Sequence, residues 1–264
     1  MRSCILLAAA LSVATLVAAP AAVAAQDYHF SKQLAQGARL EVENINGPID
    51  VTRATGRIAE VTVTKIVKEG DGALVKAIME QTGDGMRVCT IYLYSDPGRT
   101  TCNGSDHDNR RDSRGRNRLD VEMRYSVKVP AGALLTVDDV NGNITVTGAD
   151  VESKVTTVNG DIRFDGMGAA TLETVNGKIV GSFTRAAWEG TMDVQTVNGS
   201  VELTFPADLS ANVSGETVNG RVNSDFPITI EKGFGPKSFS GHIGSGGRRL
   251  KIETVNGAIS ILKR

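Results

Sequence analysis

Two adjacent carboxylates, Asp138 and Asp139, stand just before an Asn-Gly pair, and Asp161 follows the next such pair along the chain. Carboxylates that converge on one glycosidic bond can act as acid and base in its cleavage. Successive residues of a β-strand point to opposite faces, so Asp138 and Asp139 converge only across a bulge. Asp139 and Asp161 would have to meet on a shared face, and solvated outward carboxylates are the simpler expectation. A polysaccharide-acting β-helix enzyme, a lyase or hydrolase, therefore stays as an alternative function.

A polar loop, residues 95–118, is a second candidate site. Its residues 106–109, Asp-His-Asp-Asn, begin like a calcium loop, but the next two positions are Arg where such a loop needs an acid or Asn and then Gly. The loop has six arginines and four aspartates, which is typical of a segment that neutralises its own charge. Its functional interpretation is a contact loop for an acidic envelope polymer, with Arg110, Arg111 and Arg114 as candidate binding residues.

No other pattern of residues points to catalysis or to a bound group. The three histidines, His29, His107 and His242, are far apart and lack the spacing of zinc ligands. The glycine-rich run 244–247 lacks the Lys of a phosphate-binding loop. The sequence therefore predicts no metal and no cofactor. The single tryptophan, Trp188, is either an exposed anchor for a partner or a cover over the apolar edge of the fold.

The amino-terminal segment is typical of a secretory signal peptide. A basic start at Arg2 precedes an apolar stretch, residues 5–17, and the small residues 23–25, Val-Ala-Ala, fit a cleavage site before Gln26. We therefore expect removal of residues 1–25 and export to the periplasm, the cell surface or the extracellular space. An uncleaved membrane anchor is the alternative, and no later segment is apolar enough to cross a membrane.

Charge and cysteine content narrow the function further. Without Arg2, the 29 basic residues become 28 against 30 acidic residues, a formal net charge of −2. We therefore expect no nucleic-acid partner and no anionic membrane surface as a partner. Beyond residue 25 the cysteines are Cys89 and Cys102. In an exported protein this pair predicts a disulfide, worth roughly 3 kcal/mol in the chain-entropy model, and two free thiols are the alternative.

The elements that must position these residues come from a repeat. A unit of Ile or Val followed by Asn-Gly occurs seven times, at Asn46-Gly47, Asn141-Gly142, Asn159-Gly160, Asn176-Gly177, Asn198-Gly199, Asn219-Gly220 and Asn256-Gly257. From Asn141 onward the asparagines are 18, 17, 22, 21 and 37 residues apart, and a degenerate copy at Ser240 divides the last interval. A recurrence of this length indicates a repeat architecture.

Within each unit the residues alternate as in a β-strand on both sides of the Asn-Gly pair. In one unit Leu172 and Thr174 share a face, and Ile179 returns to that face after the pair. Asn and Gly adopt positive φ more readily than other residues, so the pair is expected to be a tight corner. A row of two-residue hairpins would use the same pair. The near-constant period favours a β-solenoid in which the asparagines form a hydrogen-bonded ladder.

The residues between the first and second Asn-Gly pairs do not repeat. Residues 59–68, 87–94 and 119–130 alternate as strands. Residues 71–81 have Leu74, Val75, Ile78 and Met79 at helical spacing, so one short helix is expected there.

The sequence therefore predicts an all-β chain in three parts: a signal peptide (1–25), an N-terminal β subregion with the first repeat and the polar loop (26–130), and a β-solenoid of Val-Asn-Gly repeats (131–264). The final residues, 259–264, form an apolar strand followed by two cations. We expect them to blunt one end of the stack, because open strand edges invite pairing.

Three features together resemble a bacterial family. They are the signal peptide, the repeated Val-Asn-Gly-x-[Ile/Val] phrase, and the lead-in YSVKVPAGAL at residues 125–134. The family comprises exported β-strand-repeat proteins of unknown function, known as "putative adhesin" and related to the head GIN domains. The resemblance covers residues 30–262 and implies a right-handed β-helix-like fold and an envelope location, but no catalytic residue. The polar loop at 95–118 departs from the family pattern.

These features predict a non-enzymatic, exported envelope or surface protein that acts as an adhesin-like scaffold for an unidentified polymer or protein. The alternatives are the polysaccharide-acting enzyme and a periplasmic envelope-stress factor with a protein partner. Aromatic residues, which commonly form sugar-binding platforms, are scarce, with seven Phe, four Tyr and one Trp. That scarcity and the lack of convergent acids weigh against the enzyme.

Overall fold

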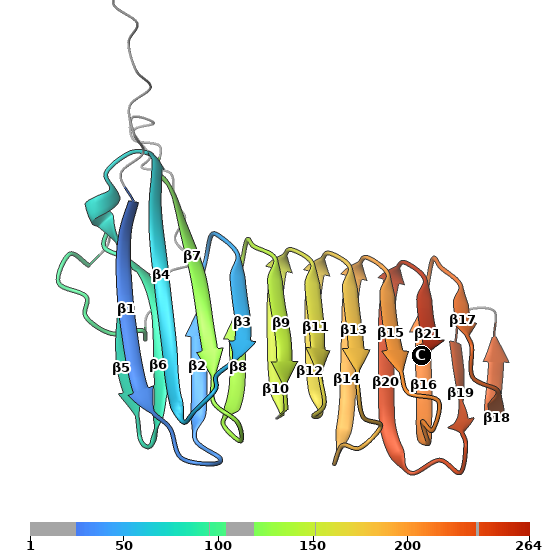
Figure 1. Cartoon of the computed structure of the whole chain (residues 1–264). Helices are drawn as coiled ribbons and strands as arrows, with labels where there is room; N and C mark the ends of the chain where they lie inside the picture. Colours follow the sequence, from blue (N-terminus) through green and yellow to red (C-terminus); the bar gives the residue numbers. More distant parts are fainter. Residues whose placement is uncertain (1–24, 95, 104–118, 151, 236–237) are drawn as a thin grey trace, which may run out of the picture.

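The chain folds into two β-sheets that face each other along one elongated stack (Figure 1). The computed structural model describes residues 25–94, 96–103, 119–150, 152–235 and 238–264. Sheet A has the order β1 (Ala25–Gln33), β4 (Ile58–Glu69), β7 (Asp120–Val129), β3 (Ile49–Arg53), β9 (Ile144–Ala149), β11 (Ile162–Gly166), β13 (Ile179–Phe183), β15 (Val201–Phe205), β21 (Ile259–Lys263) and β17 (Val222–Ser224).

Sheet B has the order β18 (Ile228–Gly235), β19 (Ser238–Ile243), β16 (Ala211–Thr217), β20 (Arg248–Asn256), β14 (Thr191–Asn198), β12 (Ala170–Asn176), β10 (Ser153–Asn159), β8 (Leu134–Asp138), β2 (Arg39–Glu43), β6 (Gly85–Tyr92) and β5 (Val75–Thr82). The one helical element among the described residues is a 3-10 turn, η1 (Gly72–Leu74). The predicted all-β class is therefore confirmed.

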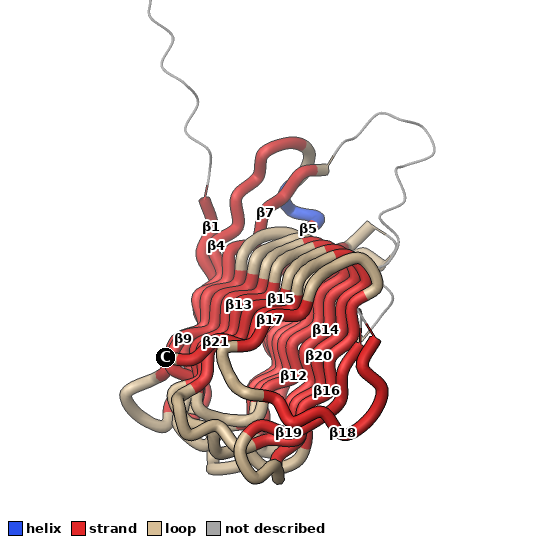
Figure 2. Tube along the Cα trace, turned by 90° about the vertical axis from the view of Figure 1, so that its right-hand side faces the viewer, coloured by secondary structure: helices blue, strands red, loops and turns tan. Residues whose placement is uncertain are grey.

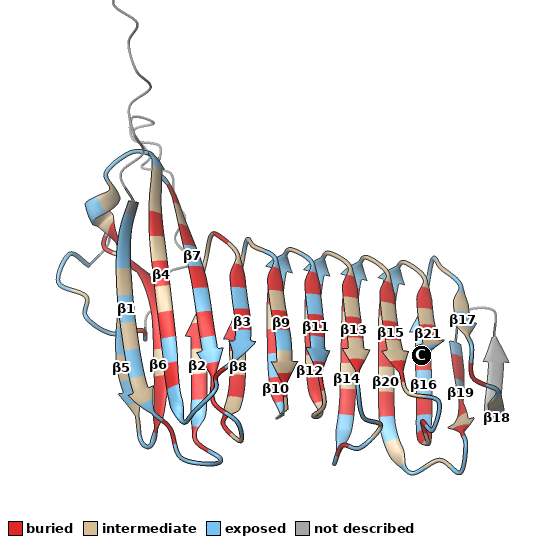
Figure 3. Ribbon diagram, viewed as in Figure 1, coloured by how far each residue is buried: buried red, intermediate tan, exposed pale blue. Residues whose placement is uncertain are grey.

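Strict alternation along the strands builds the core between the sheets. In β12, for example, Ala170, Leu172 and Thr174 are buried, and the residues between them are half-exposed. Figure 3 shows buried positions along both sheets. The inward apolar side chains form one core that extends from Leu34 to Ile261. Removal of this apolar surface from water is the main favourable contribution to folding.

Each Asn-Gly pair joins or adjoins a strand of sheet B and the next strand of sheet A. We call each such strand pair a repeat unit and name it after its asparagine: unit 46 (β2–β3), unit 141 (β8–β9), unit 159 (β10–β11), unit 176 (β12–β13), unit 198 (β14–β15), unit 219 (β16–β17) and unit 256 (β20–β21). Neighbouring units pair in parallel, with Asn176 in register with both Asn159 and Asn198. Figure 2 shows the connecting turns stacked in one row, here called the corner row.

The order of the units in space differs from their order along the chain. Unit 256 lies between units 198 and 219, because β20 pairs with both β14 and β16, and β21 with both β15 and β17. The final strand is therefore internal, and the expectation that residues 259–264 blunt an end of the stack is wrong. The spacing of the Asn-Gly pairs along the chain limits the lengths of the connections between units but does not determine the order in which the units stack.

The predicted degenerate corner at Ser240 is also wrong. Ser240 lies inside β19, which runs antiparallel to β16 and places Ser240 opposite Ser214. Phe239 of β19 is buried over Gly215, where a Cβ would lie 2.3 Å from the Phe239 ring. The antiparallel strands β18 and β19 thus form one end of sheet B.

The N-terminal region extends both sheets with antiparallel strands. In sheet A, β1, β4 and β7 lead to β3, and in sheet B, β5 and β6 lead to β2. The helix predicted for residues 71–81 is wrong, because Val75–Thr82 is strand β5, antiparallel to β6. Val75 packs into the main core, whereas Ile78 packs on the outer face beside Cys89. Because this strand has apolar residues on both faces, their spacing along the sequence is the same as that of an amphipathic helix.

Candidate functional site

The asparagines of the corner row bond to one another. Five of the seven donate from Nδ2 to the Oδ1 of the preceding asparagine in the stack over 2.7–2.8 Å, in the order Asn159 to Asn141, Asn176 to Asn159, Asn198 to Asn176, Asn256 to Asn198 and Asn219 to Asn256. Asn141 Nδ2 donates to the carbonyl oxygen of Ile45 at 3.2 Å. Asn46 instead donates to the carbonyl oxygen of Val121 at 2.9 Å. The ladder therefore follows the spatial order of the units.

The corner glycines allow close contact between the backbones of neighbouring units, and this role outweighs their ability to adopt positive φ. Among the described residues no residue other than glycine has positive φ, and of the corner glycines only Gly47 does, at 123°. A Cβ on Gly177 would lie 1.9 Å from the carbonyl oxygen of Gly160, and the other corner glycines of units 141 to 256 are as crowded. The positive φ expected at the Asn-Gly pairs therefore holds at Gly47 and is wrong for units 141 to 256, where glycine is needed because the stack leaves no space for a side chain.

A buried threonine bonds each corner to its neighbour. Two residues before the asparagine, Thr157, Thr174, Thr196, Thr254 and Thr217 donate to the carbonyl oxygens of Gly142, Gly160, Gly177, Gly199 and Gly257 over 2.8–3.3 Å. In the Thr-Val-Asn-Gly phrase, three residues thus hold the stack together. The valine does not, and its side chain is left exposed.

These exposed valines border a groove on the outer face of sheet B. The groove has a volume of about 480 Å³ and crosses β10, β12, β14, β20 and β16; we call it the sheet B groove. Val175, Val197, Val255 and Val218 line it and are 38–42% exposed. Residues one and three positions before the asparagine share the outward face. The groove therefore lies between the valine row and a second row of Thr156, Glu173, Gln195, Glu253 and Glu216.

The two candidate carboxylates before Asn141 point to opposite sides of sheet B. Asp138 is on the outer face and accepts a hydrogen bond from the hydroxyl of Thr156. Asp139 is 5% exposed and faces the interior. Asp161 is exposed at the next corner, where its Oδ1 accepts from the backbone N–H of Lys178 at 2.7 Å. The structure therefore does not bring Asp138, Asp139 and Asp161 together on one outer surface.

Asp139 occupies the position that holds threonine in the later units. Neither of its carboxylate oxygens has a hydrogen-bond partner within the described residues. Burial raises the pKa of Asp139 to about 7, and the nearby backbone N–H groups of Val140 and Asn141 offset this only in part. A neutral carboxyl group can donate a hydrogen bond as a threonine hydroxyl does.

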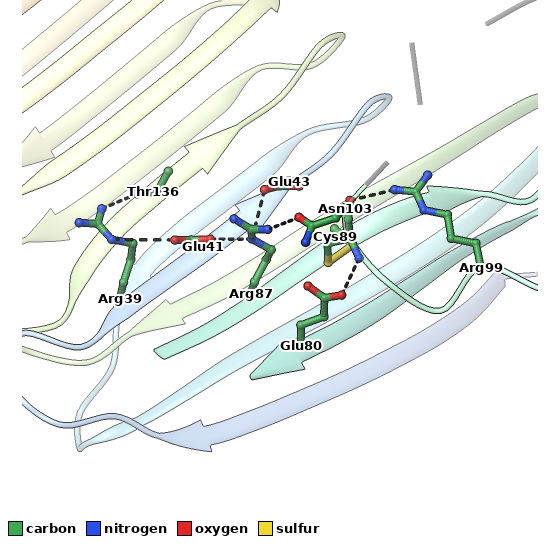
Figure 4. A network of polar contacts seen from close by, with 10 residues as sticks. Arg39, Glu41, Glu43, Glu80, Arg87, Cys89, Arg99, Asn103 and Thr136 are labelled. Carbon is green, nitrogen blue, oxygen red and sulfur yellow. Dashed lines mark hydrogen bonds and ion pairs between the residues drawn. A yellow bond between two sulfur atoms is a disulfide. The ribbon is translucent and has the colours of Figure 1, made fainter. Parts of the chain in front are cut away.

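A polar network lies on the same outer face at the N-terminal end (Figure 4). Arg87 Nε is 2.6 Å from a carboxylate oxygen of Glu41 and 3.3 Å from one of Glu43. Arg87 also donates to the side chain of Asn103 at 3.1 Å, and Glu80 accepts from the backbone N–H of Cys102 at 2.7 Å. Burial raises the pKa of Glu43 although Arg87 opposes this shift. The network holds the segment 96–103 against β5 and β6.

The predicted disulfide between Cys89 and Cys102 is confirmed, with 5.8 Å between the two Cα atoms. The bridge lies on the outer face of sheet B, in a small apolar cluster with Ile91 and Leu93. The bridge thus anchors the first part of the polar loop. The candidate binding residues Arg110, Arg111 and Arg114 lie outside the described residues.

Trp188 lies inside the fold as a cover on its apolar core. It is 6% exposed, its ring centroid is 5.9 Å from that of Phe205, and its Nε1 donates to the carbonyl oxygen of Arg249 at 3.2 Å. The structure therefore offers no exposed tryptophan anchor at this position. His29 lies within hydrogen-bond distance of the hydroxyl of Thr62. The described residues include no group of three or more His, Cys, Asp or Glu side chains that could hold a metal ion.

Sequence reasoning missed the sheet B groove. Glu216 and Glu253 are far apart in sequence but adjacent in register, because unit 256 is inserted beside unit 219. One signal was available, since the position three residues before each repeated asparagine reads Glu, Asp, Thr, Glu, Gln, Glu and Glu along the chain. Comparing the units column by column would have identified an acidic row.

Several solved structures are similar to this chain over most of its length. A solved structure of a putative cell adhesion protein from Clostridium sporogenes is 12% identical, with a TM-score of 0.40 and coverage of 90% of this chain and 100% of that chain. A putative adhesin from Bacteroides fragilis is 11% identical, with a TM-score of 0.37 and coverage of 90% and 97%. A putative lipid binding protein from Parabacteroides distasonis is 8% identical, with a TM-score of 0.30 and coverage of 89% and 96%.

No curated protein matches this chain. Across the described residues, no helix has the length and apolar character needed to span a membrane. A family model does match, over residues 35–262, which include every Asn-Gly corner and both rows of the sheet B groove. The chain therefore belongs to the Toastrack DUF4097 family.

Proposed function

We propose that this protein is a non-enzymatic, exported scaffold of the cell envelope or cell surface that binds a partner through the sheet B groove. The observation that carries this proposal is the groove itself, in which stacked units present one row of four valines and a parallel row of five polar residues. A repeated linear surface of this kind suits an extended partner, because each added unit extends the same contacts.

The proposal includes the architecture that presents the groove. The units are the coils of a short right-handed β-solenoid. Parallel pairing of consecutive units, such as β10 with β12 and β11 with β13, supports this description. A connection between parallel strands of one sheet that passes through a second layer is right-handed in nearly all proteins.

Two observations favour a scaffold over a polysaccharide-acting enzyme. Asp139 is buried and Asp138 faces outward, so these carboxylates do not share a bond-cleaving position. Asp161 is engaged by the backbone of the next corner. A periplasmic envelope-stress factor with a protein partner remains the second candidate, and the groove favours it equally because such a factor also needs a docking surface.

The test is co-sedimentation of the purified protein with insoluble cell-envelope fragments and with a panel of envelope polysaccharides. Gln195→Tyr adds bulk without charge in the middle of the groove. Thr204→Tyr is the matched control, since Thr204 is similarly half-exposed on β15 of sheet A. We expect Gln195→Tyr to reduce envelope binding by about ten-fold or more, an effect of roughly 1.4 kcal/mol, and Thr204→Tyr to leave it unchanged.

Two results would overturn the proposal. Release of new reducing sugar ends during the incubation would support the enzyme instead. An equal loss of binding in both tyrosine variants would show that the groove has no special role.

A further inference from the structure

We propose that the sheet B groove receives an extended protein segment that carries Lys or Arg side chains alternating with apolar ones. This inference rests on the proposed function and adds the chemical class of the partner. It is carried by the charge of the groove, by its row of valines and by its direction across the strands.

The acidic row of the groove has more carboxylates than nearby cations. Glu173, Glu253 and Glu216 line the groove, and no Lys, Arg or His lines it. Lys251 pairs with Glu253 at 2.9 Å. Glu173 and Glu216 make no ion pair with any other part of the chain that the structure describes. Stacked like charges repel one another, so a cationic partner would relieve a repulsion that the fold itself leaves in place.

The same row has an arginine beside it at the N-terminal end of sheet B. There the equivalent residue, Glu43, lies 3.3 Å from Arg87, and Arg87 also pairs with Glu41. Arg39 adds a second cation beside Glu41. The fold thus places Arg87 beside the acidic row in unit 46, whereas at the groove one lysine, Lys251, pairs with one of three glutamates. This contrast places the unmatched negative charge at the groove.

The valine row favours a polypeptide partner over a cationic polysaccharide. Sugar rings commonly pack their apolar faces on aromatic side chains, and none of the groove-lining residues is aromatic. Exposed Val175, Val197, Val255 and Val218 suit aliphatic side chains and the methylene stems of Lys and Arg. Five threonines also line the groove, and their hydroxyl groups donate hydrogen bonds within the fold. That of Thr156 donates to Asp138, and the other four donate to neighbouring glycine carbonyls, as Thr196 does to Gly177 at 3.0 Å.

The dimensions of the groove match a short extended segment. Five strands cross it, so its length is about 19 Å at ~4.8 Å per strand step. An extended chain of about six residues has the same length, at ~3.3 Å per residue. Alternate side chains of such a segment point in opposite directions. A segment that runs along the stack can therefore direct its cations to the glutamates and its apolar side chains to the valines.

The experiment measures binding of a fluorescent, capped octapeptide of alternating lysine and valine to the full protein by anisotropy. Two further peptides replace lysine by glutamate or valine by serine. The groove variant is Glu173→Gln, Glu216→Gln and Glu253→Gln together. Its matched control is Asp50→Asn, Asp165→Asn and Glu202→Gln, which removes three carboxylates from the outer face of sheet A with the same change in net charge.

We expect the groove variant to bind the lysine–valine peptide about ten-fold more weakly, and the sheet A variant to bind within about two-fold of the original protein. Binding should weaken between low and high salt, because exposed charges are screened. The glutamate peptide should not bind, and the serine peptide should bind several-fold more weakly than the valine peptide.

Equal binding by the two triple variants, or binding that salt does not change, would overturn the inference. Chitosan, a cationic polysaccharide, is the competing probe. If chitosan binds the original protein but not the groove variant, and the lysine–valine peptide does not bind, the groove is a sugar site and the inference is wrong. If Gln195→Tyr abolishes envelope binding but the glutamine variant does not, the proposed function stands and the cationic partner is wrong.

Discussion

Units 46 and 141, at the N-terminal junction of the corner row, differ from the later repeat units in the residue two positions before the asparagine. In units 159, 176, 198, 219 and 256 a threonine hydroxyl donates to the glycine carbonyl of the neighbouring unit. In unit 46 the equivalent residue is Asn44, whose amide donates to the carbonyl oxygen of Gly47 at 2.9 Å. In unit 141 it is Asp139. In six of the seven units the side chain at this position donates a hydrogen bond, and a carboxyl group can donate one only when it is protonated.

Of the two units with an irregular residue at this position, unit 46 gives that residue hydrogen-bond partners and unit 141 does not. Asn44 accepts a hydrogen bond from Thr90 at 2.9 Å, and Thr90 lies 2.8 Å from the hydroxyl of Tyr125. Asn44 also donates to the carbonyl oxygen of Met123 at 3.1 Å. This network satisfies the buried polar groups of unit 46. Asp139 stands beside it without a hydrogen-bond partner among the described residues, so the comparison identifies Asp139 as the weakest point of the corner row.

The largest expected effect is a pH dependence that comes from Asp139. Its pKa is about 7 in the folded protein, against an ordinary value of 3.8. The folded state therefore binds more protons than the unfolded state between these values, and stability falls as pH rises. The contribution of neutral Asp139 is fully present below about pH 4 and is lost above about pH 7, a change on the order of 4 kcal/mol.

Denaturant unfolding of the original protein and of Asp139→Asn between pH 4.5 and pH 8.5 measures this effect. Asparagine does not titrate and can donate a hydrogen bond, so the variant should lose most of the decline in stability with pH. Asp138→Asn removes a carboxylate from the outer face and should keep the decline. The interpretation fails if all three proteins have the same pH profile.

The next effect concerns the glycines of the regular units. Gly177→Ala would place a Cβ 1.9 Å from the carbonyl oxygen of Gly160, and the backbone cannot move without displacing the neighbouring unit. We expect a loss of about 3 kcal/mol in the free energy of unfolding, the upper part of the usual range for overpacking. Thermal or denaturant unfolding measures it.

Gly56→Ala is the matched control, since a Cβ there would have no atom within 4 Å. It should change the stability by less than about 0.5 kcal/mol. Equal effects of the two alanine substitutions would contradict the close-contact role of the corner glycines and return the explanation to backbone conformation.

The sequence predicts local features of this fold better than their arrangement. Alternation around Asn-Gly predicts the strands, because each strand buries one face independently of where its unit is stacked. The pairing of Cys89 with Cys102 follows from composition and export. The insertion of unit 256 between units 198 and 219 does not, because the units are so alike that each could pair with any other.

The stacking order also hides the groove and the surroundings of the candidate residues from a sequence-based prediction. Glu216 and Glu253 become neighbours only through the inserted unit. The sequence does not determine whether Trp188 is exposed, because its burial depends on the path of the segment that brings its ring to Phe205. Asp139 has the sequence context of half a catalytic pair, but it faces inward at the position that threonine occupies in the later units.

A third test removes the threonine hydroxyl from a regular unit. Thr196→Val keeps the shape of the side chain but leaves the carbonyl oxygen of Gly177 without its 3.0 Å hydrogen bond. We expect a loss of roughly 2 kcal/mol, because one buried acceptor is left unsatisfied. Thr147→Val, at an exposed position of β9, should cost less than about 0.5 kcal/mol. A loss at Thr196 no larger than at Thr147 would show that the corner carbonyls need no donor.

The smallest expected effect on the free energy of unfolding comes from two positions within the asparagine ladder. Asn198 donates to Asn176 and accepts from Asn256, whereas Asn219 ends the ladder and donates to Asn256. Because both side chains are exposed, each hydrogen bond contributes little net stability, and we expect about 1 kcal/mol for Asn198→Ala and about half of that for Asn219→Ala. Unfolding curves of the two variants, measured side by side, resolve the difference. If the ladder acts cooperatively, the loss at Asn198 exceeds twice the loss at Asn219. Equal losses would mean that each asparagine stabilises only its own corner, and the ladder would then be a consequence of stacking and not one of its causes.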